Sequence, residues 1–325
     1  MKFRRMVCWV MALALLMGAM ALAGCSKGDD TPQLEAPQET VPTLNEDGQP
    51  MRDTVLYFVD DNHYVLPVMQ PITWQEGIGK AALECLVAGT EQDGKLGMMG
   101  ISAPIPAGTK VELDIAEGTA TVNLIFGDNT PKDAKAEGAM VACIVNTLLE
   151  FPSVEGVKIR VNGQDLSALP SGTDISKVFK EKLGNVEPSG APASTAGKTD
   201  LYFVNQTGNF LVPVQRVLGE NETPVMAAQE LVSPAEGTSL VSLLPPNCQI
   251  TGVAVSQDGT ATVNVSEEFL QLSATPSMEQ MAVRGVTLTM EQFDGVEQVS
   301  ITVNGKPYQA STTTMAEGGY LNTMN

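Results

Sequence analysis

Hydrophobic and polar positions follow the same order twice along this chain. In the first half, β-branched and aromatic runs precede an apolar stripe of helical period, then two alternating segments, a second helical stripe and a final apolar run. The segments are residues 54–59, 64–69, 74–86, 111–115, 120–124, 136–151 and 157–161. This pattern predicts strand, strand, helix, strand, strand, helix and strand, and the second half repeats it.

Short identical sequences support a duplication. Gly-Thr-Ala-Thr-Val-Asn occupies residues 118–123 and returns at residues 259–264. Leu-Tyr-Phe-Val, Pro-Val and Val-Asn-Gly also recur in the same order, at offsets between 141 and 146 residues. Because each unit exceeds 100 residues, it is long enough to bury its own core. The predicted division is domain 1 at 53–183, a linker at 184–198, domain 2 at 199–310 and a flexible tail at 311–325.

Each copy predicts an α+β domain, an antiparallel sheet with two helices packed on one face. Pro67 places its strand at a sheet edge, because proline has no N–H for a second neighbour. The Asp258-Gly259 pair predicts a type I′ turn with a positive φ at Gly259. The repeated hexapeptide is therefore interpreted as a structural device.

The helix starts carry capping signals. Thr73 and Glu76 have the spacing of a capping box before the first helix, and Thr223 with Pro224 predicts the equivalent start in the second copy. Trp74 opens the apolar stripe, so we expect it in the core rather than on a ligand platform. A further short helix is predicted over residues 174–183. Methionines in the second copy's later helix are interpreted as core filler, with a promiscuous binding face as the alternative.

The N-terminus has the features of a lipoprotein signal peptide. Three of the first five residues are basic, an apolar run follows as far as Leu22, and Leu-Ala-Gly-Cys ends at Cys25. This predicts cleavage between Gly24 and Cys25 and a lipid on the Cys25 thiol, with residues 1–24 removed. A transmembrane anchor with an incidental cysteine is the alternative.

Residues 25–52 contain four prolines and few large apolar side chains, so they predict a disordered tether. The expected location is the outer face of the cytoplasmic membrane. The net charge of −19 becomes −22 when the three basic residues of the signal peptide leave. Such a polyanion argues against nucleic acid as a partner.

Candidate chemistry is sparse. Asp60, Asp61 and His63 suggest a metal or acid–base site, but the second copy has no charge at this loop, so turn formation is the better interpretation. Cys85 and Cys143 are expected to be buried thiols, with a disulfide between them as the alternative. We predict no metal, no cofactor, no catalytic residue and no enzymatic activity.

Two loops of low periodicity, residues 94–106 and their counterpart 235–246, are the predicted variable surface. No motif within them identifies a ligand.

Taken together, the Leu-Tyr-Phe-Val strands, the Gly-Thr-Ala-Thr-Val-Asn hairpins, the helix ends before Phe151 and Phe293, and the Val-Asn-Gly strand ends resemble the GerM domain family, also called the sporulation and spore germination domain. The resemblance covers most of residues 53–310. It implies a fold related to the ring-building modules of bacterial envelope machines, and a Gram-positive, spore-forming source. It supplies no catalytic residue.

The favoured hypothesis is a lipid-anchored interaction or scaffold protein that docks on envelope or sporulation proteins. A glycan or small-ligand binder using the interdomain cleft is the alternative, because duplicated domains form clefts. A cell-wall enzyme is less favoured, since the chain has one histidine and no recognisable catalytic motif.

We predict that Cys25→Ala blocks lipidation and leaves the chain unprocessed, because cleavage after Gly24 requires the lipidated thiol. Metabolic labelling with a clickable fatty acid measures this. Label retained on the Cys25→Ala variant would remove the lipoprotein assignment.

Overall fold

A computed structural model of the chain describes residues 44–45, 47–186, 198–219, 221–232, 234, 238–310 and 321–324. The predicted signal peptide, including Gly24 and Cys25, lies outside this part. All described residues belong to one of two units of the chain, Pro42–Asn325. Within them, no helix combines the length and the apolar character that a membrane crossing requires.

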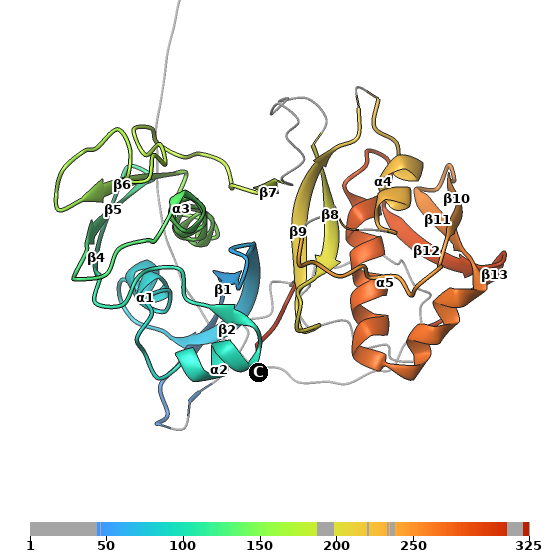
Figure 1. The fold of residues 1–325 in the computed structure, drawn as a ribbon, viewed down its shortest axis with the longest axis horizontal. Coiled ribbons are helices and arrows are strands. Elements are labelled where there is room, and N and C mark those ends of the chain that lie inside the picture. Colours follow the sequence, from blue (N-terminus) through green and yellow to red (C-terminus); the bar gives the residue numbers. More distant parts are fainter. Residues whose placement is uncertain are drawn as a thin grey trace, which may run out of the picture. The chain divides into compact units, whose positions relative to one another are not determined.

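In the first repeat, helices α1 (Ile78–Glu84) and α3 (Ala134–Leu148) lie between two small sheets (Figure 1). Its elements are β1 (Met51–Asp60), β2 (Val65–Thr73), α1 (Ile78–Glu84), α2 (Asp93–Met98), β3 (Ile101–Ser102), β4 (Lys110–Ala116), β5 (Thr119–Ile125), α3 (Ala134–Leu148) and β6 (Gly156–Val161). The sheets have the strand orders β2-β1-β3 and β4-β5-β6. Helix α3 packs on β1, and α1 packs on β4.

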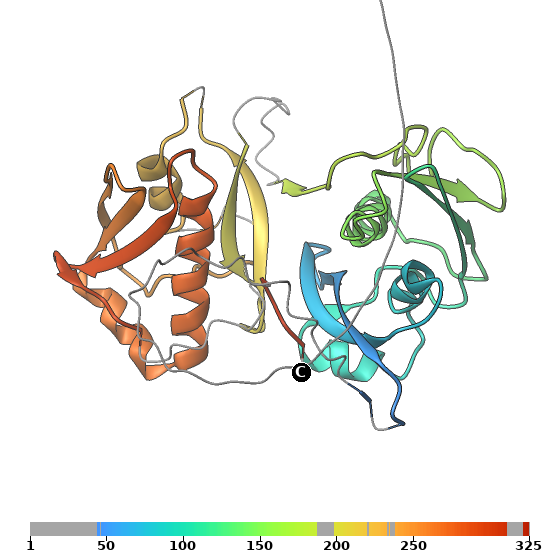
Figure 2. The same cartoon turned by 180° about the vertical axis from the view of Figure 1, so that it is seen from behind.

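The second repeat has the same plan, seen from behind in Figure 2. Its elements are β8 (Lys198–Val204), β9 (Leu211–Val217), α4 (Pro224–Glu230), β10 (Ile250–Val255), β11 (Thr260–Val265), the 3₁₀ helix η1 (Glu267–Ala274), α5 (Pro276–Glu291), β12 (Gln298–Val303) and β13 (Lys306–Pro307). A two-residue strand, β7 (Asn185–Val186), joins β9 and gives the order β7-β9-β8; the other sheet is β10-β11-β12-β13.

The predicted α+β class is confirmed, with two differences in the sheets. Strand β6 runs parallel to β5, and β12 runs parallel to β11. Each of these pairs is joined by a helix, and a parallel pair requires such a crossover. The hairpins β1–β2 and β8–β9 form sheets of their own, so the helices lie between two sheets and not on one face of a single antiparallel sheet.

The core follows the predicted alternation closely on the central strands. In β5 the side chains of Ala120, Val122 and Leu124 are fully buried. On the neighbouring edge strands, the same alternation predicts that Ile115 and Val255 are buried, but they are 43% and 45% exposed. Both lie at the hairpin tip of an edge strand, where only one neighbouring strand covers them.

The repeated asparagine of the hexapeptide joins two turns of each repeat. Oδ1 of Asn123 accepts a hydrogen bond from the backbone N–H of Gly163 at 2.7 Å, and Oδ1 of Asn264 accepts one from Gly305 at 2.8 Å. The residue before each glycine has a positive φ, as has the glycine itself. The asparagine of the hexapeptide therefore bonds to the turn formed by Val-Asn-Gly, and this contact explains why both motifs occur in each repeat.

The turn prediction at Gly259 is half right. Gly259 has a φ of 80°, as expected, but Asp258 is not among the residues of positive φ. Ser256 pairs with Thr260 and its carbonyl accepts from the N–H of Gly259, which makes a three-residue loop with a glycine bulge. The type I′ turn occurs in the first repeat, where Glu117 and Gly118 both have positive φ.

The helix-start predictions had different outcomes. Thr223 caps α4 as predicted, its hydroxyl accepting from the N–H of Met226, with Pro224 in the first turn. Thr73 is not a cap, because it ends β2 and pairs with Met51. Helix α1 starts five residues later, after Gly77. Trp74 is consequently 54% exposed and not in the core.

Three further segments differ from expectation. The described stretch 174–183 contains no helix; instead the backbone of Phe179 exchanges two hydrogen bonds with Val157 at the edge of β6. The predicted linker begins with β7. The predicted flexible tail includes residues 321–324, which pair with β2 through Met69 and Thr323.

We predict that Asn264→Ala lowers the free energy of unfolding by about 1–2 kcal/mol, because it removes bonds from Gly305 and Thr302 to Oδ1. Urea denaturation measures the loss. Asn264→Asp is the matched control, since it keeps the acceptor and should lose less. An alanine variant as stable as the unsubstituted chain would contradict the role assigned to the repeated asparagine.

Candidate interaction surfaces

The turn between β1 and β2 holds the charged residues that suggested a metal site. Oδ1 of Asp60 accepts from the backbone N–H groups of Asn62 and Tyr64, both at 2.9 Å. Its other carboxylate oxygen is buried without a hydrogen-bond partner among the described residues. Burial raises the pKa of Asp60, although the two backbone hydrogen bonds act in the opposite direction. His63 takes a positive φ of 61° in the same turn.

The second repeat closes the corresponding loop, which is one residue longer, around an uncharged side chain. Oδ1 of Asn205 accepts from the N–H groups of Asn209 and Phe210, both at 3.0 Å. The turn interpretation of Asp60 is therefore confirmed. Across the part of the chain that the structure describes, no group of three or more His, Cys, Asp or Glu side chains is placed to hold a metal ion.

The buried-thiol prediction is confirmed for Cys143, whereas Cys85 is only half-buried. Cys85, Cys143 and Cys248 are all free, so the alternative disulfide between Cys85 and Cys143 is wrong. Cys143 is fully buried on α3, and burial raises its pKa well above the ordinary value of a thiol. Because the thiolate is the reactive form, these thiols are poorly suited to nucleophilic chemistry.

The first predicted variable loop, residues 94–106, is partly regular and makes a contact with the second repeat. The backbone carbonyl of Met99 accepts from Oγ1 of Thr207 at 2.9 Å and from Nδ2 of Asn209 at 3.3 Å. A Cβ on Gly100 would lie 2.3 Å from Cγ2 of Thr207, so only glycine allows this approach. This loop is consequently less open to a partner than the sequence suggested.

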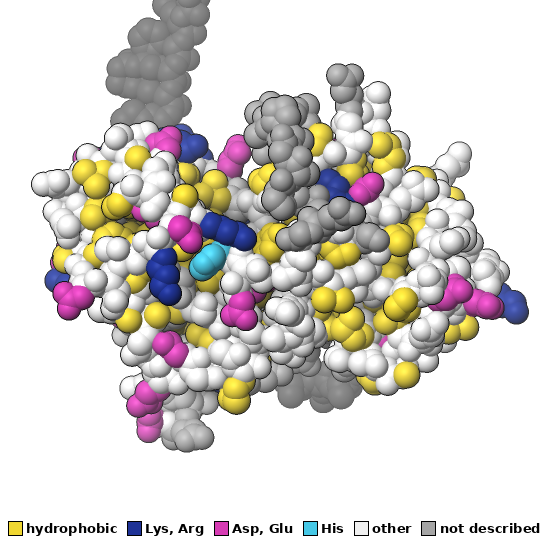
Figure 3. All heavy atoms as spheres, in the orientation of Figure 1, with side chains coloured by type: hydrophobic (Ala, Val, Ile, Leu, Met, Phe, Trp, Pro, Cys, Tyr) yellow, Lys and Arg dark blue, Asp and Glu magenta, His cyan; other side chains and the backbone are white. Residues whose placement is uncertain are grey.

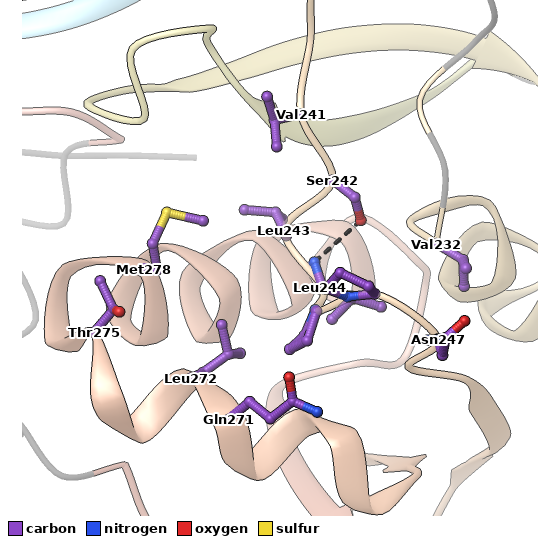
Figure 4. A pocket seen from close by; sticks show the side chains of 12 residues that line it. Val232, Val241, Ser242, Leu243, Leu244, Asn247, Gln271, Leu272, Thr275 and Met278 are labelled. Atoms are coloured by element: carbon purple, nitrogen blue, oxygen red, sulfur yellow. Dashed lines mark hydrogen bonds between the residues drawn. The ribbon is translucent and has the colours of Figure 1, made fainter.

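Its counterpart, residues 235–246, contributes to a cavity of about 520 Å³ on the second repeat (Figure 4). The wall combines the loop before β10 with η1 and the start of α5. In Figure 4 the side chains of Leu243, Leu272 and Met278 come together from these three elements. The remaining lining residues are Val232, Val241, Ser242, Leu244, Pro245, Pro246, Asn247, Gln271 and Thr275.

Most of the described side chains that line this cavity are apolar, and the polar ones are Ser242, Asn247, Gln271 and Thr275. None of the described residues that line it is charged. The hydroxyl of Ser242 donates to the carbonyl of Leu231 and accepts from the N–H of Leu244, both at 3.1 Å, so it is already engaged within the protein. On the face in Figure 3, hydrophobic side chains lie across the second repeat, whereas charged side chains and the histidine gather mainly over the first. The cavity thus suits apolar groups of a ligand or partner.

A family model described as "Germane: Sporulation and spore germination" matches residues 55–167 and 200–309, one match in each repeat. The chain belongs to the Germane family. It is 30% identical to the spore germination protein GerM of Bacillus subtilis over 264 residues, which cover 77% of this chain and 71% of that protein. Family membership supports a role related to sporulation or germination.

A solved structure gives the same result for the architecture. The tandem GerMN domains of the sporulation protein GerM from Bacillus subtilis match with a TM-score of 0.59 and 26% identity. The match covers 84% of this Germane chain and all of the solved one. The tandem organisation predicted from the sequence repeat is therefore confirmed.

Of the predicted site residues, Gly24 and Cys25 lie outside the described part, so lipid attachment stays a prediction. Sequence reasoning did not find the cavity, because its lining residues come from a loop and two helix ends with no shared period. It also did not assign a role to Asn185 or Asn322. Both lie beyond the family matches, in the segments expected to be linker and tail.

We predict that Asp60→Asn becomes increasingly more stable than the unsubstituted chain as pH rises above the ordinary aspartate pKa of 3.8. A folded-state pKa above the unfolded one means that the folded chain retains a proton that the unfolded chain has released, so rising pH reduces stability until Asp60 is ionised. Asparagine keeps the acceptor, as Asn205 shows.

Urea denaturation between pH 3.5 and 7 measures the difference. Asp61→Asn, which removes an equal charge at an exposed neighbour, is the control. A stability difference for Asp60→Asn that stays constant with pH would contradict the effect of burial.

Proposed function

We propose that this Germane chain is a lipid-anchored, extracytoplasmic scaffold protein of the bacterial envelope, acting in sporulation or germination by docking on other envelope proteins. The observation that carries the proposal is the tandem family match over residues 55–167 and 200–309. The curated relative is named as a spore germination protein and the solved one as a sporulation protein.

The N-terminal sequence supplies the anchor and the reach. Two or three acyl chains on the Cys25 segment would hold the chain durably on a bilayer, whereas a single chain holds only marginally. A tether of this length has a root-mean-square span of roughly 30 Å. The repeats would then stand away from the lipid surface, where they can meet other envelope proteins.

The cavity of the second repeat supports docking on a protein. The described residues of its lining carry no charge, and Val241 at its rim is 46% exposed. Interface pockets of this kind accept aliphatic or aromatic side chains of a partner. A glycan could form hydrogen bonds with the side chains of Asn247, Gln271 and Thr275, but the described lining residues include no aromatic ring for a sugar to stack on. The glycan alternative is therefore less well supported.

The chemistry of the described side chains also favours binding over catalysis. The buried thiols, the turn-forming Asp60 and the uncharged cavity give no nucleophile with an adjacent base. We accordingly propose a non-enzymatic role, with no cofactor or metal.

The proposal predicts that Val241→Lys weakens capture of a stoichiometric envelope partner, because it places a charge at the rim of an apolar cavity. Val255→Lys is the matched control: Val255 is also an exposed valine of the second repeat, at 45%, but it does not line the cavity. Both chains would be purified from detergent-solubilised envelopes after cross-linking, and partners quantified by mass spectrometry.

We expect the partner to be retained by Val255→Lys and reduced at least about tenfold with Val241→Lys, as for an anchor side chain worth about 1.4 kcal/mol or more. Partner recovery that is the same for both variants would contradict docking at the cavity. Absence of any stoichiometric protein from the unsubstituted chain would contradict the scaffold proposal itself.

A further inference from the structure

Strand β2 lies at the edge of its sheet, as its proline predicted, and presents backbone groups away from β1. These groups belong to Val65, Pro67 and Met69, which alternate along the strand. An unpaired N–H or C=O that is buried costs on the order of 1–3 kcal/mol. Strand β9 of the second repeat has the equivalent residues Leu211, Pro213 and Gln215, each 146 positions later.

Asn185 of β7 supplies partners to both strands. Its Oδ1 accepts from the N–H of Val65 at 2.7 Å. Its Nδ2 donates to the carbonyl of Val65 at 2.6 Å and to the carbonyl of Pro213 at 2.7 Å. The backbone of the same segment pairs in parallel with β9, with Val186 opposite Gln215.

Asn322 repeats this arrangement with the two strands exchanged. Its Oδ1 accepts from the N–H of Leu211 at 2.7 Å. Its Nδ2 donates to the carbonyl of Leu211 at 2.9 Å and to the carbonyl of Pro67 at 2.8 Å. Its segment pairs in parallel with β2, with Thr323 opposite Met69.

The correspondence is complete, residue by residue. The side chain of each asparagine bonds to the N–H and the carbonyl of one residue, Val65 for Asn185 and Leu211 for Asn322. It also donates to the proline carbonyl of the opposite strand. The residue after each asparagine pairs with the residue two positions after that proline. The carboxamide suits this task because it offers one acceptor and two donors. Aspartate lacks the donors, and an apolar residue lacks both kinds of group.

We propose that the seam between β2 and β9 is a peptide-binding site with two equivalent slots, and that Leu321–Met324 is the cis ligand of the second slot. The recognised ligand is an extended segment in parallel register with a central asparagine. Apolar neighbours add to the binding: Leu321 packs against the core and Met324 is only 6% exposed. The slot therefore accepts the same sequence in trans when the cis asparagine is removed.

Amide hydrogen exchange of the full chain tests occupancy of the slot. Asn322→Ala should accelerate exchange at Leu211 and Met69 about tenfold, because it removes the side-chain bonds that hold the segment in place. Thr323→Ala is the matched control, being in the same segment with no side-chain hydrogen bond described for it, and should change exchange by less than about twofold. Equal effects of the two substitutions would overturn the clasp role of Asn322.

Binding in trans uses a fluorescent synthetic peptide of residues 318–325. We expect it to bind the Asn322→Ala chain at least about tenfold more tightly than the unsubstituted chain, whose slot is filled. The reason is that Asn322→Ala removes the three neutral hydrogen bonds that hold the cis segment in the slot. A peptide with alanine in place of Asn322 should lose that binding, whereas alanine in place of Asn325 should not. Equal affinity of the peptide for both chains, or binding to neither, would overturn the proposal.

A third variant, Asn322→Asp, separates loss of individual hydrogen bonds from loss of the folded structure. Asn322→Asp keeps the acceptor for Leu211 but loses both donors, and should show exchange and peptide binding between those of the alanine variant and the unsubstituted chain. Circular dichroism matching the unsubstituted chain verifies that each variant is folded. Full protection in Asn322→Asp would contradict the part assigned to the two carbonyl bonds.

Discussion

Edge strands with outward-facing backbone groups are the constraint on which the arrangement of this chain depends. Pro67 and Pro213 limit what a neighbouring strand can bond to β2 and β9, because neither residue offers an N–H. A full-length partner strand would find no donor at that point. Side-chain amides solve this problem, since Asn185 and Asn322 reach the proline carbonyls from short segments that need only two or three paired residues. The segments that follow each repeat therefore belong to the fold.

The same chemical device acts at the far sheets. Asn123 and Asn264 accept from glycine N–H groups at the ends of β6 and β12, in turns that leave those groups without a ladder partner. Asn205 and Asp60 each accept two backbone hydrogen bonds within their hairpin loops, although the loops differ in length. Amide side chains thus replace missing backbone partners at several turns and edges. The conserved order of short motifs across the two repeats reflects these local needs, and the Germane family match follows the same two regions.

The sequence predicted the elements well where hydrophobic period is strong. The stripes of α3 and α5, the alternation of β5 and the cap at Thr223 all follow from local rules. It predicted poorly where tertiary pairing overrides local preference. Thr73 has the spacing of a cap, but strand pairing with Met51 extends β2 through it and leaves Trp74 exposed. The parallel pairing of β6 with β5 depends on a crossover that periodicity does not report.

The candidate sites were harder still. A single asparagine in a linker carries no period, so nothing at Asn185 or Asn322 distinguished them from solvated residues. The cavity assembles Leu243, Leu272 and Met278 from three elements, and each side chain alone looks like ordinary core. Duplication could have helped, because the two asparagines follow equivalent domains, but their spacing of 137 residues differs from the 141–146 of the motifs within the repeats.

Because Asn185 and Asn322 each bond to strands of both repeats, we infer that their segments bind the repeats into one cooperative unit. Differential scanning calorimetry of the chain and of the double variant Asn185→Ala/Asn322→Ala tests it most directly. We expect one transition for the unsubstituted chain, with equal calorimetric and van't Hoff enthalpies, and two resolved transitions for the double variant. Two independent transitions in the unsubstituted chain, or one unchanged transition in the double variant, would contradict it.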